Sequence, residues 1–186
     1  METPRFLSGQ FLLAMPGIGD PRFARSVIAM CVHDEGGALG IGLGKVVPGL
    51  GFHHLLEQLD IDPGVAPNAP IHLGGPVEPQ RGFVLHANDW GGQESVDVAG
   101  RWTMSPTIDV LKAIAAGKGP SRWVAALGYA GWEAGQLEDE LSGHGWFATE
   151  GDEALLFDVE AEHRWASGFS GAGIDPRLLT AEFGTA

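Results

Sequence analysis

The chain has 186 residues and a formal net charge of −13 at pH 7, and its length falls within the usual range of one domain. Apolar residues make up 44% of it, close to the roughly 45–50% of ordinary soluble domains, which excludes a chain that is disordered throughout. Its single cysteine, Cys31, excludes an intramolecular disulfide and a zinc site built from several thiolates.

The first half of the chain is predicted to form short strands and two helices. Apolar runs between turn residues indicate strands, an Asp-Pro pair indicates a helix start, and apolar residues at i, i+3, i+4 and i+7 indicate an amphipathic helix. In chain order we expect a strand over residues 10–15, a short helix over 20–25, a strand over 26–32, a turn over 33–37, a strand over 38–43, a helix on Phe52, Leu55, Leu56 and Leu59, and a loop over 62–70. The strands on either side of the turn are expected to pair as a hairpin with a longer loop.

The second half is predicted from the same signals. We expect strands over 71–73 and 82–86, a hairpin of 94–98 with 101–104 that turns at Ala99-Gly100, a helix from Ser105 to a stop at Gly117, a strand over 123–129, a helix on Leu137 and Leu141, strands over 146–148 and 154–157, a polar helix over 159–166, and a final turn at Asp175-Pro176. Strands and helices are mixed without regular βαβ alternation, so the fold class predicted is α+β, as one domain over residues 1–186.

No targeting or membrane segment is apparent. The N-terminus lacks the apolar run and small-residue cleavage site of a secretory signal. The apolar stretches are far shorter than the roughly 20 residues of a membrane helix. We therefore expect a cytoplasmic location.

Glycine is unusually abundant, at 29 of 186 positions against a typical share of about 7%. The G-x-G spacing recurs, but never with the third glycine of G-x-G-x-x-G, and Gly44-Lys45 lacks the opening glycine of a P-loop. The segment 128–132 is predicted as a strand-to-helix turn whose N–H groups would suit an anion, yet four acidic residues crowd the following helix start and would repel phosphate. The glycines therefore indicate turns and close backbone approach.

Charge is distributed unevenly. Between Arg122 and Arg164 there is no Lys or Arg, whereas ten acidic residues occur. Because binding to a nucleic-acid backbone depends on several Lys or Arg contacts, we expect no direct contact with nucleic acid. The acidic stretch is either a solvated surface or a face for a basic partner.

The sequence predicts no catalytic, cofactor-binding or metal-binding residues. No HExxH, HxH or HxxxH spacing joins any two of the seven histidines, although distant histidines that converge in space remain open. Cys31 and His33 alternate on one strand face, so both would meet the same side of the sheet. Cys31 nevertheless lies in a strongly apolar run, and we interpret it as a core residue.

An ordered series of short motifs runs along nearly the whole chain. They are residues 9–16 (GQFLLAMP), Asp20-Pro21 with Phe23, Ser26 and Val27, 37–40 (GALG), 74–77 (GGPV), 81–86 (RGFVLH), 117–120 (GKGP), 128–141 (GYAGWEAGQLEDEL), Leu156-Phe157 and Arg164-Trp165. In content and order they resemble the bacterial YqgE/AlgH family.

The resemblance implies a compact α+β domain with a mixed, bifurcated sheet that includes a small closed barrel and is surrounded by helices. It implies no established enzyme reaction, and the family's regulator label rests on an effect on exopolysaccharide gene expression, which needs no contact with DNA. Two segments depart from the family pattern: Gly44-Lys45-Val46, where relatives usually have Asn-Arg/Lys-Pro, and the C-terminus at 183–186. Any family ligand site formed by either segment would be altered here.

The favoured interpretation is a cytoplasmic regulatory or protein-interaction domain that binds a protein partner. A basic partner would suit its acidic surface, and no direct contact with DNA or a membrane is expected. The alternative is a small-molecule-binding protein or enzyme that uses the glycine-rich turn over 128–140 with nearby histidines. Trp132 is the tryptophan expected at a surface. The candidate ligand or partner surface consists of His33, His86, Trp132, Gln136, Glu138 and Glu140. No cofactor is expected, and the oligomeric state is not predicted.

Overall fold

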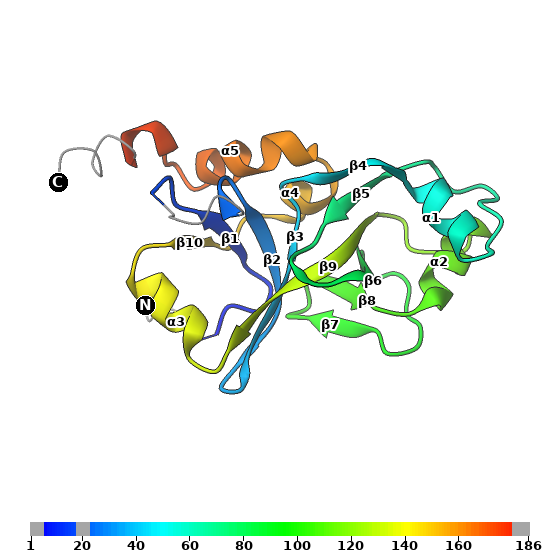
Figure 1. Cartoon of the computed structure of the whole chain (residues 1–186), viewed down its shortest axis with the longest axis horizontal. Coiled ribbons are helices and arrows are strands. Elements are labelled where there is room, and N and C mark those ends of the chain that lie inside the picture. The colour runs from blue at the N-terminus through cyan, green and yellow to red at the C-terminus, as the bar shows by residue number, and fades with distance from the viewer. Residues whose placement is uncertain (1–5, 18–22, 180–186) are drawn as a thin grey trace.

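The computed structural model describes residues 6–17 and 23–179, and within them the chain forms ten strands and five labelled helices, with a further helical segment at 176–179 (Figure 1). The strands are β1 (Phe11–Ala14), β2 (Val27–Asp34), β3 (Gly37–Gly42), β4 (Val46–Gly51), β5 (Pro70–Leu73), β6 (Val77–His86), β7 (Val96–Val98), β8 (Trp102–Ser105), β9 (Trp123–Glu133) and β10 (Trp146–Thr149). The helices are α1 (Phe52–Gln58), α2 (Ile108–Ala115), α3 (Gln136–Ser142), α4 (Glu153–Phe157) and α5 (Ala161–Gly171).

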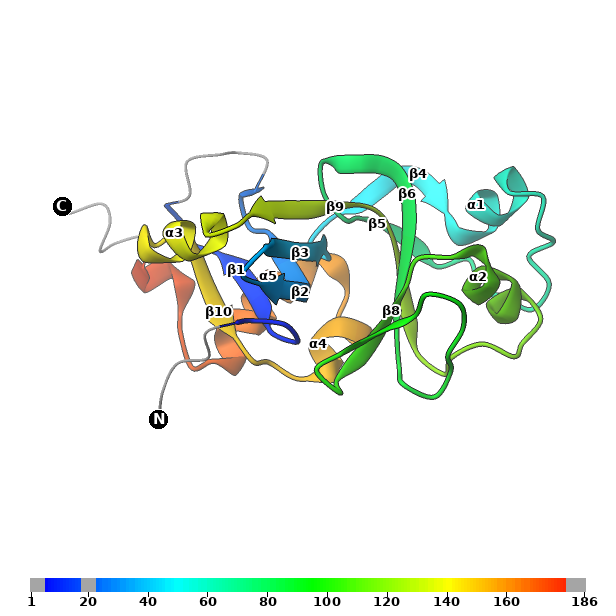
Figure 2. The same ribbon diagram turned by 90° about the horizontal axis from the view of Figure 1, so that it is seen from below.

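One sheet contains all ten strands and branches at β9. Its main path is β10-β1-β2-β3-β9-β6-β8-β7, while β4 and β5 lie off this path and β5 runs parallel to β9. The first part of β9 pairs with β5 and β6, whereas its last residues pair with β3, where Leu39 lies opposite Gly131. Strand β9 therefore joins two halves of the molecule, one with α3 and α5 and the other with α1 and α2 (Figures 1 and 2).

The mixed α+β class predicted from the sequence is confirmed, but a small closed barrel is not. In the described residues the main strand path ends at β10 on one side and at β7 on the other. All pairings are antiparallel except that between β5 and β9.

Three buried apolar clusters follow the branching of the sheet. The largest packs β1–β3 against β6, β8, α4 and α5, and Phe11 and Phe169 are fully buried in it. The second lies under α1 and α2 and includes Phe52 and Val110, and the third lies under α3 and includes Leu137. Burying an apolar side chain of this size contributes roughly 1.5–3 kcal/mol, so these clusters fix where each helix lies.

Close backbone approach accounts for the glycines at the branch point. The Gly74 N–H donates to the Leu127 carbonyl at 2.8 Å. A Cβ added at Gly75 would overlap the carbonyl group of Tyr129, and one at Gly128 would overlap the Gly75 carbonyl oxygen. The prediction that glycine serves close backbone contacts is confirmed at these positions.

Two strands run further than predicted. β2 continues through His33 to Asp34 and β3 begins at Gly37, so the hairpin has a tight turn instead of a longer loop. β9 continues past Tyr129 to Glu133, because its last residues pair with β3. The glycine-rich segment read as a strand-to-helix turn is therefore mostly strand.

The apolar run over 154–157 is a helix, and the strand predicted there was wrong. The Asp152 side chain accepts a hydrogen bond from the Leu155 N–H at 3.3 Å and so caps the start of α4. A run of four apolar residues fits a strand or a helix equally well by periodicity, so the cap is the deciding signal.

Helix α2 begins after Thr107, two residues after the Ser105 start that the sequence predicted, and its first residue, Ile108, is 43% exposed. The hairpin of β7 and β8 does turn at Ala99-Gly100, where both residues have positive φ values of 53° and 73°. Of the helix predicted over 20–25, residues 20–22 lie outside the described residues, and residues 23–25 form no α-helix.

Candidate functional site

Five of the six candidate residues meet around helix α3. The helix follows Gly135, which has a φ of 80°, and it buries Leu137 against the sheet. Glu138 and Glu140 contact different groups, as their two-residue spacing on a helix predicted. His33 on β2, Trp132 on β9 and Trp146 on β10 supply the partners for the two carboxylates.

His33 has both ring nitrogens occupied. Its Nδ1 accepts a hydrogen bond from the Leu7 N–H at 2.9 Å, which leaves the proton of a neutral ring on Nε2. That Nε2 donates to the Glu138 carboxylate. His33 is 5% exposed, and both of its ring nitrogens are hydrogen-bonded, so no nitrogen is left to act as a base toward a ligand.

Glu140 gathers three donors. One carboxylate oxygen accepts from the indole N–H of Trp132 at 3.2 Å and from that of Trp146 at 3.0 Å, and the other accepts from the Gln136 amide at 2.9 Å. Trp132 is 8% exposed, so the expectation that it is presented at a surface was wrong: its strand continues through this position and its indole turns to Glu140. These contacts fasten α3 to β9 and β10.

An acidic face surrounds this cluster, and it consists of the exposed residues Asp34, Glu35, Glu133, Glu138 and Asp139. The strand register brings them together, because Asp34 pairs with Gly37 and Gly37 pairs with Glu133. None of β2, β3, β9, β10 or α3 contains Lys or Arg. Asp34 and Glu35 at the β2–β3 turn therefore add to the acidic residues that lie between Arg122 and Arg164 in the sequence.

His86, the sixth candidate, lies in the other half of the molecule. It is fully buried on β6, where Nδ1 donates to the Ala87 carbonyl and Nε2 accepts from the Ser105 hydroxyl, both at 2.7 Å. Burial lowers the pKa of His86, which keeps the ring neutral. His86 therefore does not share a site with α3.

A buried arginine escaped the sequence analysis. Arg164 on α5 is 3% exposed and donates to the carbonyls of Leu43, Leu155 and Leu156 at 2.8–3.0 Å, and to Nε2 of His72 at 2.6 Å. Burial, followed by the Arg164 charge, lowers the pKa of His72 to about 4. Both residues border a cavity of about 600 Å³.

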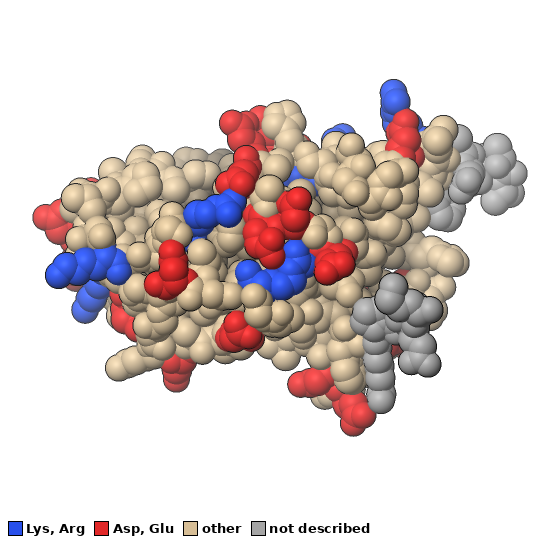
Figure 3. Space-filling view, turned by 180° about the vertical axis from the view of Figure 1, so that it is seen from behind, with Lys and Arg blue, Asp and Glu red and all other residues tan. Residues whose placement is uncertain are grey.

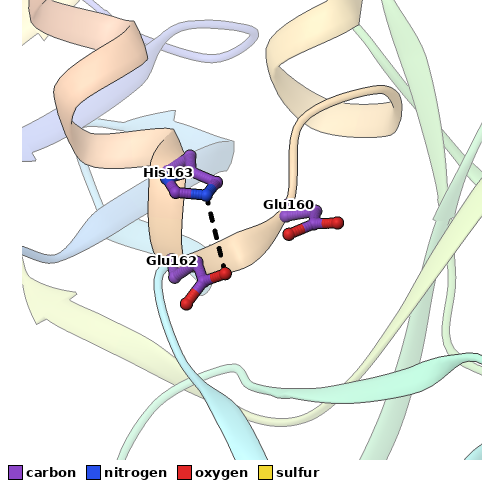
Figure 4. Close-up of side chains that lie close together, drawn as sticks. All are labelled: Glu160, Glu162 and His163. Carbon is purple, nitrogen blue, oxygen red and sulfur yellow. Dashed lines mark ion pairs between the residues drawn. The ribbon is translucent and has the colours of Figure 1, made fainter.

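Glu160, Glu162 and His163 stand together at the start of α5, with ligand atoms within 4.8 Å of one another (Figure 4). His163 Nε2 lies 3.5 Å from Glu162 Oε1. All three are exposed, and the spacing E-x-E-H was not among the metal motifs searched in the sequence. The arrangement is that of a surface ion pair with an acidic neighbour.

Cys31 is a core residue, as predicted. It is 4% exposed, and burial raises the pKa of its thiol to about 12, so the thiolate is not formed near neutral pH. Lys45, in the segment that departs from the family pattern, borders a cavity of about 350 Å³ beside Gly74, Gly75 and Pro76. The other departing segment, 183–186, lies outside the described residues.

Basic side chains are few and mostly engaged. Arg101 lies 3.2 Å from Glu153, Arg122 pairs with Asp158, and Arg177 lies 2.8 Å from Asp175. On the face shown in Figure 3, Lys and Arg are scattered and form no continuous basic patch. In the described part of the chain, no helix has both the length and the apolar character needed to cross a membrane.

Similar proteins cover the chain from end to end. A UPF0301 protein of Rhizorhabdus wittichii is 59% identical over 186 residues, covering 100% of both chains, and one of Novosphingobium aromaticivorans is 55% identical over the same span. The solution structure of the AlgH protein from Pseudomonas aeruginosa matches with a TM-score of 0.81 at 42% identity, over 97% of this chain and 96% of that one. A crystal structure of a Corynebacterium diphtheriae protein shares the fold, with a TM-score of 0.74 at 22% identity over 96% and 94% of the two chains. The family model described as AlgH-like matches residues 11–177, and the chain belongs to this AlgH-like, UPF0301 family.

Proposed function

We propose that the whole chain, residues 1–186, is a cytoplasmic protein-interaction domain with a regulatory role, which binds a basic segment of a partner protein. The observation that carries the proposal is the acidic face around α3, with five exposed carboxylates from three parts of the chain and no Lys or Arg on the elements that build it. Opposite charge on a partner speeds association and fixes its orientation. A like-charged polymer such as DNA is repelled by the same face.

The distribution of basic residues argues in the same direction. Of the Lys and Arg residues in the described part of the chain, Arg164 is buried, and Arg81, Arg101, Arg122 and Arg177 pair with carboxylates. Binding to a DNA backbone requires several cations that neutralise phosphates. We therefore propose that any regulatory effect is exerted without direct DNA contact.

The alternative, a small-molecule or catalytic site at residues 128–140, receives less support from the geometry. His33 has no unoccupied ring nitrogen, and the Glu140 carboxylate is committed to three donors. A ligand at this position would have to displace hydrogen bonds that fasten α3 to the sheet. Protein binding at the exposed Asp34, Glu133 and Asp139 carboxylates leaves those bonds intact.

The proposal is tested by charge reversal in three matched baits: the native chain, Glu133→Lys with Asp139→Lys, and a control with Glu57→Lys and Glu150→Lys. All four positions are exposed, and both variants change the net charge equally. Proteins captured from the cells that make the chain are quantified at low and at high salt. Exposed ion pairs contribute about 0.2–1 kcal/mol each, so reversal of two charges is expected to weaken capture about tenfold or more.

The expected result is a basic partner that is retained by the native and control baits, lost with the α3-side variant, and weakened by salt. Equal capture by all three baits would contradict the proposed face. A second measurement follows retention of the native chain on duplex DNA, for which we expect none even at low salt. Salt-sensitive retention there would overturn the proposal that DNA is not contacted.

A further inference from the structure

A chain of polar side chains lies in the half of the molecule away from α3. It connects His86 on β6, Ser105 at the end of β8, and Ser95 just before β7. The Ser105 hydroxyl lies 2.7 Å from His86 Nε2 and 2.7 Å from the Ser95 hydroxyl oxygen. His86 is fully buried and Ser105 is 1% exposed.

One carbonyl group fixes which atom donates and which accepts in each of these side-chain hydrogen bonds. His86 Nδ1 lies 2.7 Å from the Ala87 carbonyl oxygen, which can only accept, so Nδ1 carries the proton and Nε2 carries a lone pair. Ser105 must then donate to Nε2, and Ser95 must donate to Ser105. The Ser95 oxygen in turn accepts from the Gly92 N–H at 3.1 Å. The Ser105 oxygen is therefore polarised by a neutral imidazole that is ready to take its proton.

Ser105 also borders a cavity of about 190 Å³, whereas His86 is not among the residues that line it. The walls come from α1, α2, β6, β8 and β9, and they include the apolar residues Leu55, Leu59, Val84, Ile108, Leu111 and Leu127. Leu59 and Ile108 are 42% and 43% exposed, so the cavity is reached from solvent between α1 and α2. Because Ser105 pairs with Val84, its side chain lies on the same face of the sheet as that part of the cavity wall and as His86, two residues further along β6.

We infer that Ser105 is a nucleophile with His86 as its general base, and that this site takes carboxylic esters with a small apolar acyl group. The cavity volume suits an acyl chain of a few carbons, and its walls carry no charged side chain. A hydroxyl beside a correctly oriented base is the minimal arrangement for nucleophilic acyl transfer. This inference goes beyond partner binding at the acidic face and shares no residue with it.

The reaction balances with water as the second substrate. The Ser105 oxygen bonds to the ester carbonyl carbon while its proton passes to His86 Nε2. The tetrahedral intermediate then expels the alkoxide, which takes that proton and leaves as the alcohol. Water attacks the acyl-serine with His86 again accepting a proton, and that proton returns to the Ser105 oxygen as the carboxylic acid departs.

A Ser–His bond that merely holds β6 to β8 would give no chemistry, and two measurements separate the cases. The native chain is incubated with a fluorophosphonate probe and the labelled peptide is identified by mass spectrometry. Hydrolysis of p-nitrophenyl butyrate is followed in parallel against an equal concentration of imidazole. We expect the label on Ser105 and turnover at least about 100-fold above imidazole, in line with general-base assistance of about 10²–10⁴-fold.

Variants then assign the roles. Ser105→Ala is expected to lose both label and turnover, while Ser142→Ala, at an exposed serine on α3, keeps both. His86→Gln is expected to lower the labelling rate at least 100-fold without moving the label. Peptide mapping on the native chain does not depend on the folding of any variant. A label on another residue, or no label with turnover equal to imidazole, would overturn the inference.

Discussion

Truncation of Glu140 is expected to destabilise the fold through two buried indoles. In Glu140→Ala the N–H groups of Trp132 and Trp146 lose their common acceptor, and these residues are 8% and 5% exposed. An unpaired buried donor costs about 1–3 kcal/mol, whereas the exposed Gln136 amide can bond to water instead. Since the half-buried position of Glu140 admits some water, we expect a loss of about 2–4 kcal/mol. The corresponding fall in Tm is roughly 4–16 °C for a chain of this size.

Urea unfolding followed by tryptophan fluorescence measures this loss, and both indoles report directly on their own surroundings. Asp139→Ala is the matched control, because Asp139 is the residue next to Glu140 and its side chain is exposed. For this control we expect the free energy of unfolding to change by at most about 0.5–1 kcal/mol. A double-mutant cycle with Trp146→Phe isolates the Glu140–Trp146 term and is expected to show coupling. A cost for Glu140→Ala no larger than that of the control, or additive double mutants, would refute the view that Glu140 is an anchor for α3.

Three further predictions concern the core. Gly75→Ala is expected to cost more than about 3 kcal/mol in urea unfolding, because a Cβ there overlaps the Tyr129 carbonyl at a φ of +153°, whereas Gly171→Ala, with open space around it, should cost less than about 1 kcal/mol. The pKa of His72 falls from 6.5 to about 4 on folding, so the unfolded chain binds a proton that the folded chain does not. The free energy of unfolding should therefore decrease by at most roughly 3 kcal/mol as pH falls from 6.5 to about 4. His72→Gln should flatten this pH dependence, and an unchanged slope would exclude His72 as its source. The Cys31 thiol, with its pKa raised to about 12, should resist a thiol reagent at pH 7.5 until urea unfolds the chain, and labelling of the native chain at the rate of a free thiol would show that the site opens.

The sequence was most informative where local chemistry alone decides the structure. The i, i+3, i+4 spacing from Phe52 predicted α1, and Ala99-Gly100 predicted the turn between β7 and β8. It failed where tertiary pairing overrides a local signal. Gly131 reads as a strand end, but the backbone of β3 lies alongside it and extends β9 to Glu133. No local pattern reports the presence of that neighbouring strand.

The sequence predicted most of the residues that meet at α3, but it did not predict which of them contact each other. The motif around α3 pointed to Glu138 and Glu140. Only the folded chain shows that Glu138 binds His33, 105 residues away in the sequence, and that Glu140 binds the indoles of Trp132 and Trp146 on β9 and β10. The Ser105–His86 contact has the same character, since neither residue belongs to a recognisable nucleophile motif. Arg164 entered the sequence analysis only as part of a family motif and as the end of the stretch without Lys or Arg, and nothing in its surroundings along the chain indicates burial.

The branching of the sheet makes the two proposed sites separable by experiment. The acidic face lies where the end of β9 pairs with β3. His86 lies on β6 opposite Trp123, the first residue of β9, and Ser105 lies on the neighbouring strand β8. In the described part of the chain the two sites share no residue and no hydrogen bond, so Glu133→Lys with Asp139→Lys should weaken partner capture about tenfold or more and leave ester turnover unchanged. Gly75→Ala, which strains the Gly128–Tyr129 segment between the two pairings, should lower both in whatever fraction remains folded. If the charge reversals lowered turnover as well, the two halves would be coupled through β9, and the acidic face would act on the chemistry as well as on a partner.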